Sequence, residues 1–250
     1  MPPKKKNNNA LAFSILFSAL VLSASIVFFG LQMQGGSLQG DVLQAEIEKG
    51  IEAYVQKAQD DYDQQVADSQ PPERVEVDFS DDDAVLGDAD AQITMIEFSD
   101  YECPYCATFY RETLPKIKSE YIDSGQVKLV YRDNPLSFHD NAYPAALAAE
   151  CVRDQLGDEG YFDMHDKLFG GNSLALSTLE GYATDLGVDI AEYNSCVNGE
   201  KFKEEIEKDM NDARSLKLNG TPSFIINGRI VTGAQPFEVF SQVIEEELAS

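Results

Sequence analysis

The sequence predicts an α/β domain with an inserted α-helical subdomain, preceded by an N-terminal transmembrane helix and an amphipathic helix. The run Gln92–Phe98 is rich in β-forming residues and reads as a buried strand, and a helix opens soon after it at Cys103. A second strand follows at Gln126–Tyr131, so that this βαβ unit should hold two parallel strands. About ninety residues then pass before strands return at Ser223, where one crossover helix would have been enough. A helical subdomain is therefore expected between the two parts of the sheet.

The N-terminal region predicts a single-pass membrane anchor. The uncharged run Ala10–Leu31 follows the basic cluster Lys4–Lys6. As a helix this run would be roughly 33 Å long, enough for a bilayer core of about 30 Å. The alternative is a cleaved signal peptide, whose apolar region has only about 7 to 15 residues. Because lysines favour the cytoplasmic side, we expect a cytoplasmic tail at residues 1–9, an anchor at 10–31 and the remainder outside the cytoplasm.

The charge of the chain limits its partners. It has 44 acidic and 19 basic residues, a formal net charge of −25, and all of the acidic residues follow the predicted anchor. Such a surface repels nucleic acid and anionic lipid, so we expect no nucleic-acid partner. An exported domain also lies in an oxidising compartment, where disulfides persist.

Residues 32–74 are expected to form a linker and an amphipathic stalk helix. Over residues 41–66, apolar side chains recur mostly three or four positions apart. This helix could pack on the domain, or it could pair with a second copy and form a homodimer. After it, Val75–Phe79 alternates like a short edge strand, and Ser80–Asp83 predicts a solvated loop.

Residues 75–250 are expected to form the folded domain, with the helical insert at about 141–219. Ser177 and Glu180 predict a capping box at the start of one insert helix. The helices expected in the insert cover Asn141–Leu156, Tyr161–Phe169, a stretch from Ser177 to Gly187, and Phe202–Ala213.

The end of the chain predicts a hairpin and a final helix. The strands Ser223–Ile226 and Arg229–Thr232 flank Asn227-Gly228, a strong signal for a two-residue β-turn. Pro236 then opens a helix with apolar residues on one face.

Cys103 and Cys106 predict a redox-active pair. The first turn of a helix has unpaired N–H groups and roughly half a positive charge, which favours a thiolate at Cys103. Pro104 suits this turn because its missing N–H has no partner there in any case. Cys106 lies one turn further on and could attack a mixed disulfide on Cys103. Cysteines in this setting have pKa values of about 3.5 to 7.5, compared with about 8.5 for free cysteine.

Two other interpretations of the pair are a zinc site and two inert core cysteines. Structural zinc requires four ligands, usually two Cys-x-x-Cys pairs. The other cysteines, Cys151 and Cys196, are isolated, and neither His139 nor His165 lies beside the motif in the sequence. We therefore favour redox chemistry, and we expect neither a metal nor a bound cofactor.

The order of elements resembles a thioredoxin-fold protein of the DsbA-like branch over about Asp83–Leu248. Phe98–Cys106 is similar to the active-site segment of that family. Tyr131–Leu136 with His139 is similar to its strand and loop leading into the insert, and Asn219–Gly228 is similar to its cis-proline loop and hairpin.

The resemblance implies a role for several residues. Cys103 matches the exposed nucleophilic cysteine, and Cys106 matches the buried resolving cysteine. Pro222, preceded by Thr221, matches the cis-proline that lies against the disulfide and presents backbone groups to a substrate strand. Glu97 matches a buried acid beneath the active site, which implies proton shuttling to Cys106.

Other positions modify this expectation. The dipeptide Pro104-Tyr105 lacks the histidine of the most oxidising members and resembles that of glutaredoxins. Glu102, directly before the nucleophile, adds a negative charge that should oppose the thiolate. Some DsbA-like relatives carry a structural disulfide within the insert, which implies a pairing of Cys151 with Cys196.

The resemblance implies a membrane-anchored thiol–disulfide oxidoreductase that acts outside the cytoplasm and introduces disulfides into exported proteins. A membrane redox partner of the DsbB or VKOR type would reoxidise it. Within the same fold, the alternative is a disulfide isomerase or reductase. From a different class, the alternatives are a non-enzymatic thiol metal chaperone and an anchored adaptor.

Overall fold

The computed structural model describes residues 47–61, 74–77 and 82–250. The predicted anchor at residues 10–31 and much of the predicted linker lie outside these ranges. Within the ranges described, no helix has the length and apolar character needed to cross a membrane. Residues 47–61 are helical and mostly exposed, and they form part of the amphipathic helix expected over residues 41–66. Residues 69–250 form a separate compact unit.

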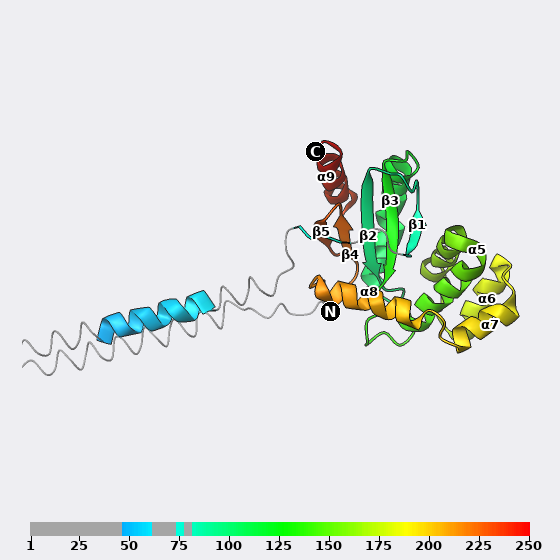
Figure 1. Cartoon of the computed structure of the whole chain (residues 1–250), viewed down its shortest axis with the longest axis horizontal. Coiled ribbons are helices and arrows are strands. Elements are labelled where there is room, and N and C mark those ends of the chain that lie inside the picture. The colour runs from blue at the N-terminus through cyan, green and yellow to red at the C-terminus, as the bar shows by residue number, and fades with distance from the viewer. Residues whose placement is uncertain (1–46, 62–73, 78–81) are drawn as a thin grey trace, which may run out of the picture. The chain divides into compact units, whose positions relative to one another are not determined.

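A five-stranded mixed sheet forms the centre of this unit, in the order β1-β3-β2-β4-β5 (Figure 1). Its strands are β1 (Ala84–Leu86), β2 (Ile93–Ser99), β3 (Val127–Asp133), β4 (Ser223–Ile226) and β5 (Arg229–Thr232). β2 and β3 are parallel, as a βαβ unit requires, while β1 and β4 run antiparallel to their neighbours. Asn227 and Gly228 have φ angles of 45° and 92°, the left-handed conformations that the predicted hairpin turn needs.

The helices of this unit connect the strands of the sheet, except α9, which follows β5. The helical elements are α3 (Pro104–Glu112), α4 (Leu114–Ile117), the π-helix η1 (Lys118–Ile122), α5 (Ala142–Gly170), α6 (Leu176–Leu186), α7 (Ile190–Asn198), α8 (Lys203–Ser215) and α9 (Phe237–Leu248). The first three connect β2 to β3, and α5 to α8 form the expected insert between β3 and β4 (Figure 1). Gly157, at φ 71°, interrupts α5, which explains why the sequence pattern predicts two helices there.

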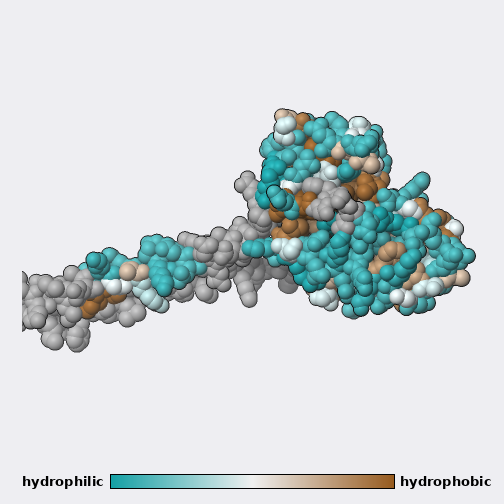
Figure 2. All heavy atoms as spheres, viewed as in Figure 1, coloured by the Kyte–Doolittle hydropathy of each residue, from teal (hydrophilic) through white to brown (hydrophobic). Residues whose placement is uncertain are grey.

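The alternation of side chains along β2 divides the core into two layers. Ile93 and Met95 point to the larger cluster, which also contains Phe109 of α3 and Phe240 of α9. Intervening residues of β2 pack in a smaller cluster on the other face, with Ala213 of α8. On the face of the unit shown in Figure 2, hydrophilic residues cover most of the surface, in agreement with the acidic composition.

Two predictions before the first central strand differ from the structure at the residues it describes, while residues 78–81 of these two segments lie outside those residues. The described residues of the predicted strand Val75–Phe79 form no strand. Val75 N–H donates to Gly228 O (2.7 Å), and the preceding residue, Arg74, makes one isolated bridge with Arg229. The edge of the sheet beside β3 is instead occupied by β1.

Asp83 was expected in a solvated loop, yet it is only 5% exposed. Its carboxylate pairs with the guanidinium of buried Arg132, a partner that composition alone does not reveal. The expected capping box is also absent. Helix α6 begins at Leu176 and Ser177 lies inside it, because Ala175 occupies the N-cap position without a side-chain cap.

Candidate active site

Cys103 and Cys106 lie where the chain leaves β2 and enters α3. Cys103 is the N-cap of α3 and has extended backbone angles, with Pro104 following it at the first helical position. Its N–H donates to Asp100 O (3.1 Å), which closes a tight turn after the strand. Both cysteines are free thiols. This is the reduced form of the pair.

Cys103 was expected to be exposed, but it is only 4% exposed. Its Sγ lies 3.4 Å from the carbonyl oxygen of Thr221, so the loop before β4 covers it. Pro104 and Tyr105 are the exposed residues of the motif, and Tyr105 is 66% exposed. A reaction partner therefore meets Tyr105 at the surface before it reaches the sulfur.

The two thiols have very different acidities. A hydrogen bond with Cys106 lowers the pKa of Cys103 from 9.0 to about 5, with smaller contributions from Thr221 and the N–H groups of Cys106 and Tyr105, against the effect of burial. Burial raises the pKa of Cys106 far above its usual range, and the charges of Cys103 and Glu97 add to this effect. The pair thus holds a thiolate at Cys103 and a proton at Cys106.

The peptide bond between Thr221 and Pro222 is cis. Pro222 O accepts from Gly233 N–H (2.9 Å), which ties this loop to the end of β5. Thr221 Oγ1 is buried and makes no other hydrogen bond within the described residues, so its hydroxyl is available to the thiolate of Cys103, whose pKa it helps to lower. The sequence indicated only that a proline follows Thr221 before a strand. The structure places Thr221 against Cys103, and the cis bond to Pro222 follows directly.

Glu97 lies on β2 beneath the pair and is only 1% exposed. Burial raises the pKa of its carboxyl from 4.5 to about 8, and the hydroxyl of Ser99 opposes this shift. At neutral pH the carboxyl is therefore largely protonated. The charge of this carboxyl, when ionised, contributes to the raised pKa of Cys106.

Asp100 is a site residue that sequence reasoning missed. Its side chain is fully buried. One carboxylate oxygen accepts from Glu102 N–H (2.7 Å), and the other accepts from Leu136 N–H (2.8 Å) and from Nδ1 of His139 (2.8 Å). An aspartate at the start of a turn commonly accepts from the N–H two residues on, so the segment did contain a local signal.

Glu102 was expected to oppose the thiolate of Cys103. Its carboxylate instead accepts from the backbone N–H of Asn141 (2.6 Å) and from Nδ2 of Asn141 (3.2 Å). Asn141 is the N-cap of α5, so the positive end of that helix counters the charge of Glu102.

Cys151 and Cys196 form a disulfide with their Cα atoms 5.9 Å apart. The bond joins α5 to α7 within the insert, and this is the pairing that the family resemblance implies. Cys103 and Cys106 remain apart from it as free thiols.

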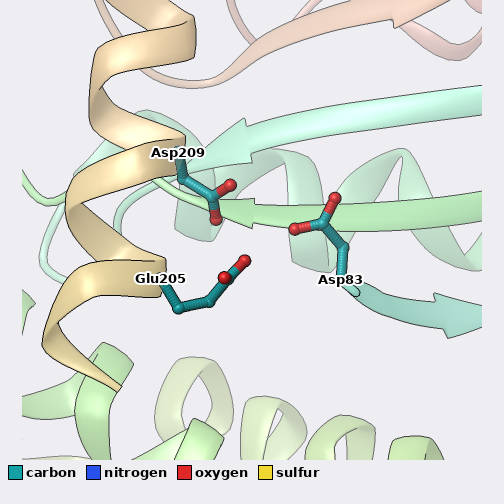
Figure 3. A group of neighbouring side chains, drawn as sticks. All are labelled: Asp83, Glu205 and Asp209. Atoms are coloured by element: carbon teal, nitrogen blue, oxygen red, sulfur yellow. The ribbon is translucent and has the colours of Figure 1, made fainter. Parts of the chain in front are cut away.

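Asp83, Glu205 and Asp209 form a cluster of acidic side chains that could hold a metal ion, with one oxygen of each within 4.8 Å of the others (Figure 3). Glu205 and Asp209 come from α8, and Asp83 precedes β1 (Figure 3). Arg132 supplies a positive charge here, with Nε 2.7 Å from Asp83 Oδ2 and 3.9 Å from Asp209 Oδ1. Burial raises the pKa of Asp209 to about 10. This cluster does not include the redox pair.

Comparisons with known proteins agree on one family. The family described as Thioredoxin matches residues 80–246. Disulfide bond formation protein D of Bacillus subtilis (strain 168) is 30% identical over 174 residues, covering 66% of this chain and 76% of that protein. The crystal structure of oxidised BdbD from Bacillus subtilis has a TM-score of 0.62 and 28% identity, covering 67% of this chain and 94% of that one. The crystal structure of Wolbachia pipientis alpha-DsbA1 has a TM-score of 0.59 and 28% identity, covering 66% and 90%.

Proposed function

This chain belongs to the thioredoxin family as a DsbA-like thiol–disulfide oxidoreductase, and from that premise we propose that it introduces disulfides into exported proteins outside the cytoplasm. The difference in acidity between the two cysteines carries the proposal. The pKa of Cys103 is lowered to about 5, while that of Cys106 is raised. At neutral pH the folded protein therefore stabilises the reduced pair with a thiolate at Cys103, which makes the disulfide form a stronger oxidant.

The reaction begins with the Cys103–Cys106 disulfide. A substrate thiolate attacks Sγ of Cys103, the bond between the two sulfurs breaks, and its electron pair remains on Sγ of Cys106. Because the pKa of Cys106 is raised, this sulfur takes up a proton at once. Glu97, a buried carboxyl with a pKa of about 8, supplies that proton and later regains one from solvent.

The second step releases the product. Another substrate thiolate attacks the substrate sulfur of the mixed disulfide, and Cys103 leaves as a thiolate. A thiol of low pKa leaves faster, so the acidity of Cys103 serves this step as well. Two electrons pass from the substrate dithiol to the pair. Both substrate protons enter solvent, and one proton from solvent restores Glu97, so the pair gains one proton in all, on Cys106.

Neighbouring groups orient the substrate. Thr221 lies against Cys103, and the cis peptide bond to Pro222 follows it, so the backbone of this loop can align an extended substrate segment beside the nucleophile. Pro104 and Tyr105 form the exposed rim. A membrane partner of the DsbB or VKOR type would then remove the two electrons from the reduced pair.

The reduction potential of the Cys103–Cys106 pair tests this proposal. Equilibration of the purified chain with glutathione should give a value above roughly −150 mV, near the oxidising end of this fold. A value below about −230 mV would contradict disulfide donation and favour the reductase or isomerase alternative. A Cys103→Ser variant should lose all exchange. If it kept its biological effect, the adaptor alternative would replace this proposal, while metal binding by the reduced pair would favour a metal chaperone.

We also propose that the enzyme is anchored in the membrane. The uncharged segment at residues 10–31 supports a single-pass anchor with the catalytic domain outside the cytoplasm. Fractionation of cells that produce the full chain should find it in the membrane, and external protease should reach the domain. Crosslinking would test whether the helix at residues 41–66 forms a homodimer.

A further inference from the structure

The three residues directly before Cys103 all have side chains that reach the helical insert or the loop leading into it. Asp100 is the first of them. One oxygen of its buried carboxylate accepts from Leu136 N–H (2.8 Å) and from Nδ1 of His139 (2.8 Å), both in the loop between β3 and α5. The backbone oxygen of Asp100 also accepts from the N–H of Cys103 (3.1 Å). A single residue therefore links the nucleophile to the loop that begins the insert.

Tyr101 is the second link and is only 4% exposed. Its hydroxyl donates to the hydroxyl of Tyr161 (3.2 Å), and Tyr161 donates in turn to Asp133 Oδ2 (3.4 Å). Its ring also packs against Phe169, with the centroids 4.9 Å apart. Tyr161 and Phe169 belong to the part of α5 after Gly157, so the second half of this helix holds Tyr101.

Glu102 is the third link. Its carboxylate accepts from the backbone N–H and the side-chain amide of Asn141, at the start of α5. Helix α5 thus contacts the active-site loop at both of its halves, through Asn141 and Tyr161. The loop has only Asp100, Tyr101 and Glu102 between the end of β2 and Cys103. The side chain of each residue in this short connection contacts the insert or the loop that leads into it.

We propose that Asp100, Tyr101 and Glu102 are positioning residues that make the reactivity of Cys103 depend on the helical insert. The thiolate is stabilised by short-range hydrogen bonds from Cys106, from Thr221 and from N–H groups at the start of α3. Hydrogen bonds of this kind weaken steeply with distance and angle. Without the contacts to the insert, Cys103 would no longer be held in the position that these donors require.

Substitutions in the insert, at a distance from the cysteines, should therefore change the pKa of Cys103. Removing the Tyr161 hydroxyl leaves every residue of the motif in place and removes no charged group. The pKa of Cys103 should nevertheless rise, because the donors around the sulfur are less well aligned. A purely structural role for the same contacts would lower the free energy of unfolding and leave the pKa of Cys103 unchanged.

The test uses two substitutions in and before the insert. Tyr161→Phe removes the hydroxyl that holds Tyr101, and His139→Ala removes a donor to Asp100. We expect the double variant of the reduced full chain to show a Cys103 pKa about one unit higher, a tenfold change in thiolate stabilisation. Tyr161→Phe alone should give part of this rise. The pH dependence of alkylation of Cys103 measures the pKa, and urea unfolding measures stability separately.

Tyr193→Phe is the matched control, since it removes a hydroxyl from another buried tyrosine of the insert, on α7. Its Cys103 pKa should equal that of the wild type. A folded double variant with an unchanged pKa would overturn the inference. If the double variant fails to fold, the Tyr161→Phe variant alone tests the inference. An unchanged Cys103 pKa in that variant would also overturn it. The inference rests on the oxidoreductase chemistry alone. A low wild-type potential would refute disulfide donation and leave this result unaffected.

Discussion

The sulfur of Cys103 lies 3.4 Å from the carbonyl oxygen of Thr221, although the two residues are 118 positions apart. This contact brings the residue before the cis peptide bond directly against the nucleophile. After the hydrogen bond with Cys106, Thr221 is one of the groups that lower the pKa of Cys103. The loop before β4 therefore covers the nucleophile and, through the side chain of Thr221, contributes to its acidity.

Replacement of Thr221 by valine should raise the pKa of Cys103 by about one unit. Valine has nearly the same shape and lacks the hydroxyl, and a hydrogen bond to a charged group contributes about 1.5 kcal/mol or more. Alkylation rates of the reduced protein as a function of pH would measure the shift. A Thr221→Ser control keeps the hydroxyl and should keep the low pKa. Equal pKa values for the valine and serine variants would contradict a role for this group.

Glu97→Gln should change how stability depends on pH. Because burial raises the pKa of Glu97 from 4.5 to about 8, the folded state holds this proton more tightly than the unfolded state does. The stabilisation is complete below about pH 4.5 and is lost as the pH rises toward 8, with a slope of up to about 1.4 kcal/mol per pH unit. The glutamine variant lacks this loss, so its stability should vary less over the same window.

Urea unfolding of the oxidised protein and of the oxidised Glu97→Gln variant at pH 5 and pH 8 would test this. The oxidised form is used because neither Cys103 nor Cys106 then titrates. Parallel changes in the two proteins would show that the carboxyl of Glu97 has an ordinary pKa.

Much of the fold follows from local patterns. The strand before Cys103, the helix start at Pro104 and the turn at Asn227-Gly228 all depend on neighbouring residues, and the sequence predicts them. The insert follows from the length of chain between strands. These features need no knowledge of distant partners.

The parts that were not predicted depend on distant contacts. Asp83 reads as solvated because its partner, Arg132, lies 49 positions away. From the sequence, Glu102 was expected to place an unfavourable charge beside Cys103. Its partner, Asn141 at the start of α5, is near it only in the folded chain. Asp100 carries a local turn signal, but its bonds to Leu136 and His139 are tertiary. Patterns in a single sequence can predict helices, strands and turns, but they do not predict which distant residues pair in the folded protein.

Arg132→Met should destabilise the protein strongly. The Arg132 and Asp83 side chains are each 2% exposed, and Asp209 also faces the guanidinium. Removal of one partner leaves buried charge uncompensated, at a cost of about 3–5 kcal/mol. Lys201→Met is a suitable control, because it removes a more exposed pair with Asp154 and should cost less than about 1 kcal/mol. Urea unfolding of both variants would test the difference, and similar losses would contradict it.

Gly157→Ala should destabilise the protein by about 1–3 kcal/mol. Gly157 has φ 71° and ψ −167°, a backbone conformation that is essentially restricted to glycine. Nothing lies within 4 Å of an added Cβ, so the loss would come from the backbone and not from a steric clash.

Gly181, inside α6, has equally open surroundings but no positive φ. Gly181→Ala should therefore stabilise the protein, by up to about 1 kcal/mol. Thermal unfolding should separate the two variants by opposite shifts in Tm, and shifts of the same sign would show that Gly157 is not required for the turn that brings Tyr161 to Tyr101.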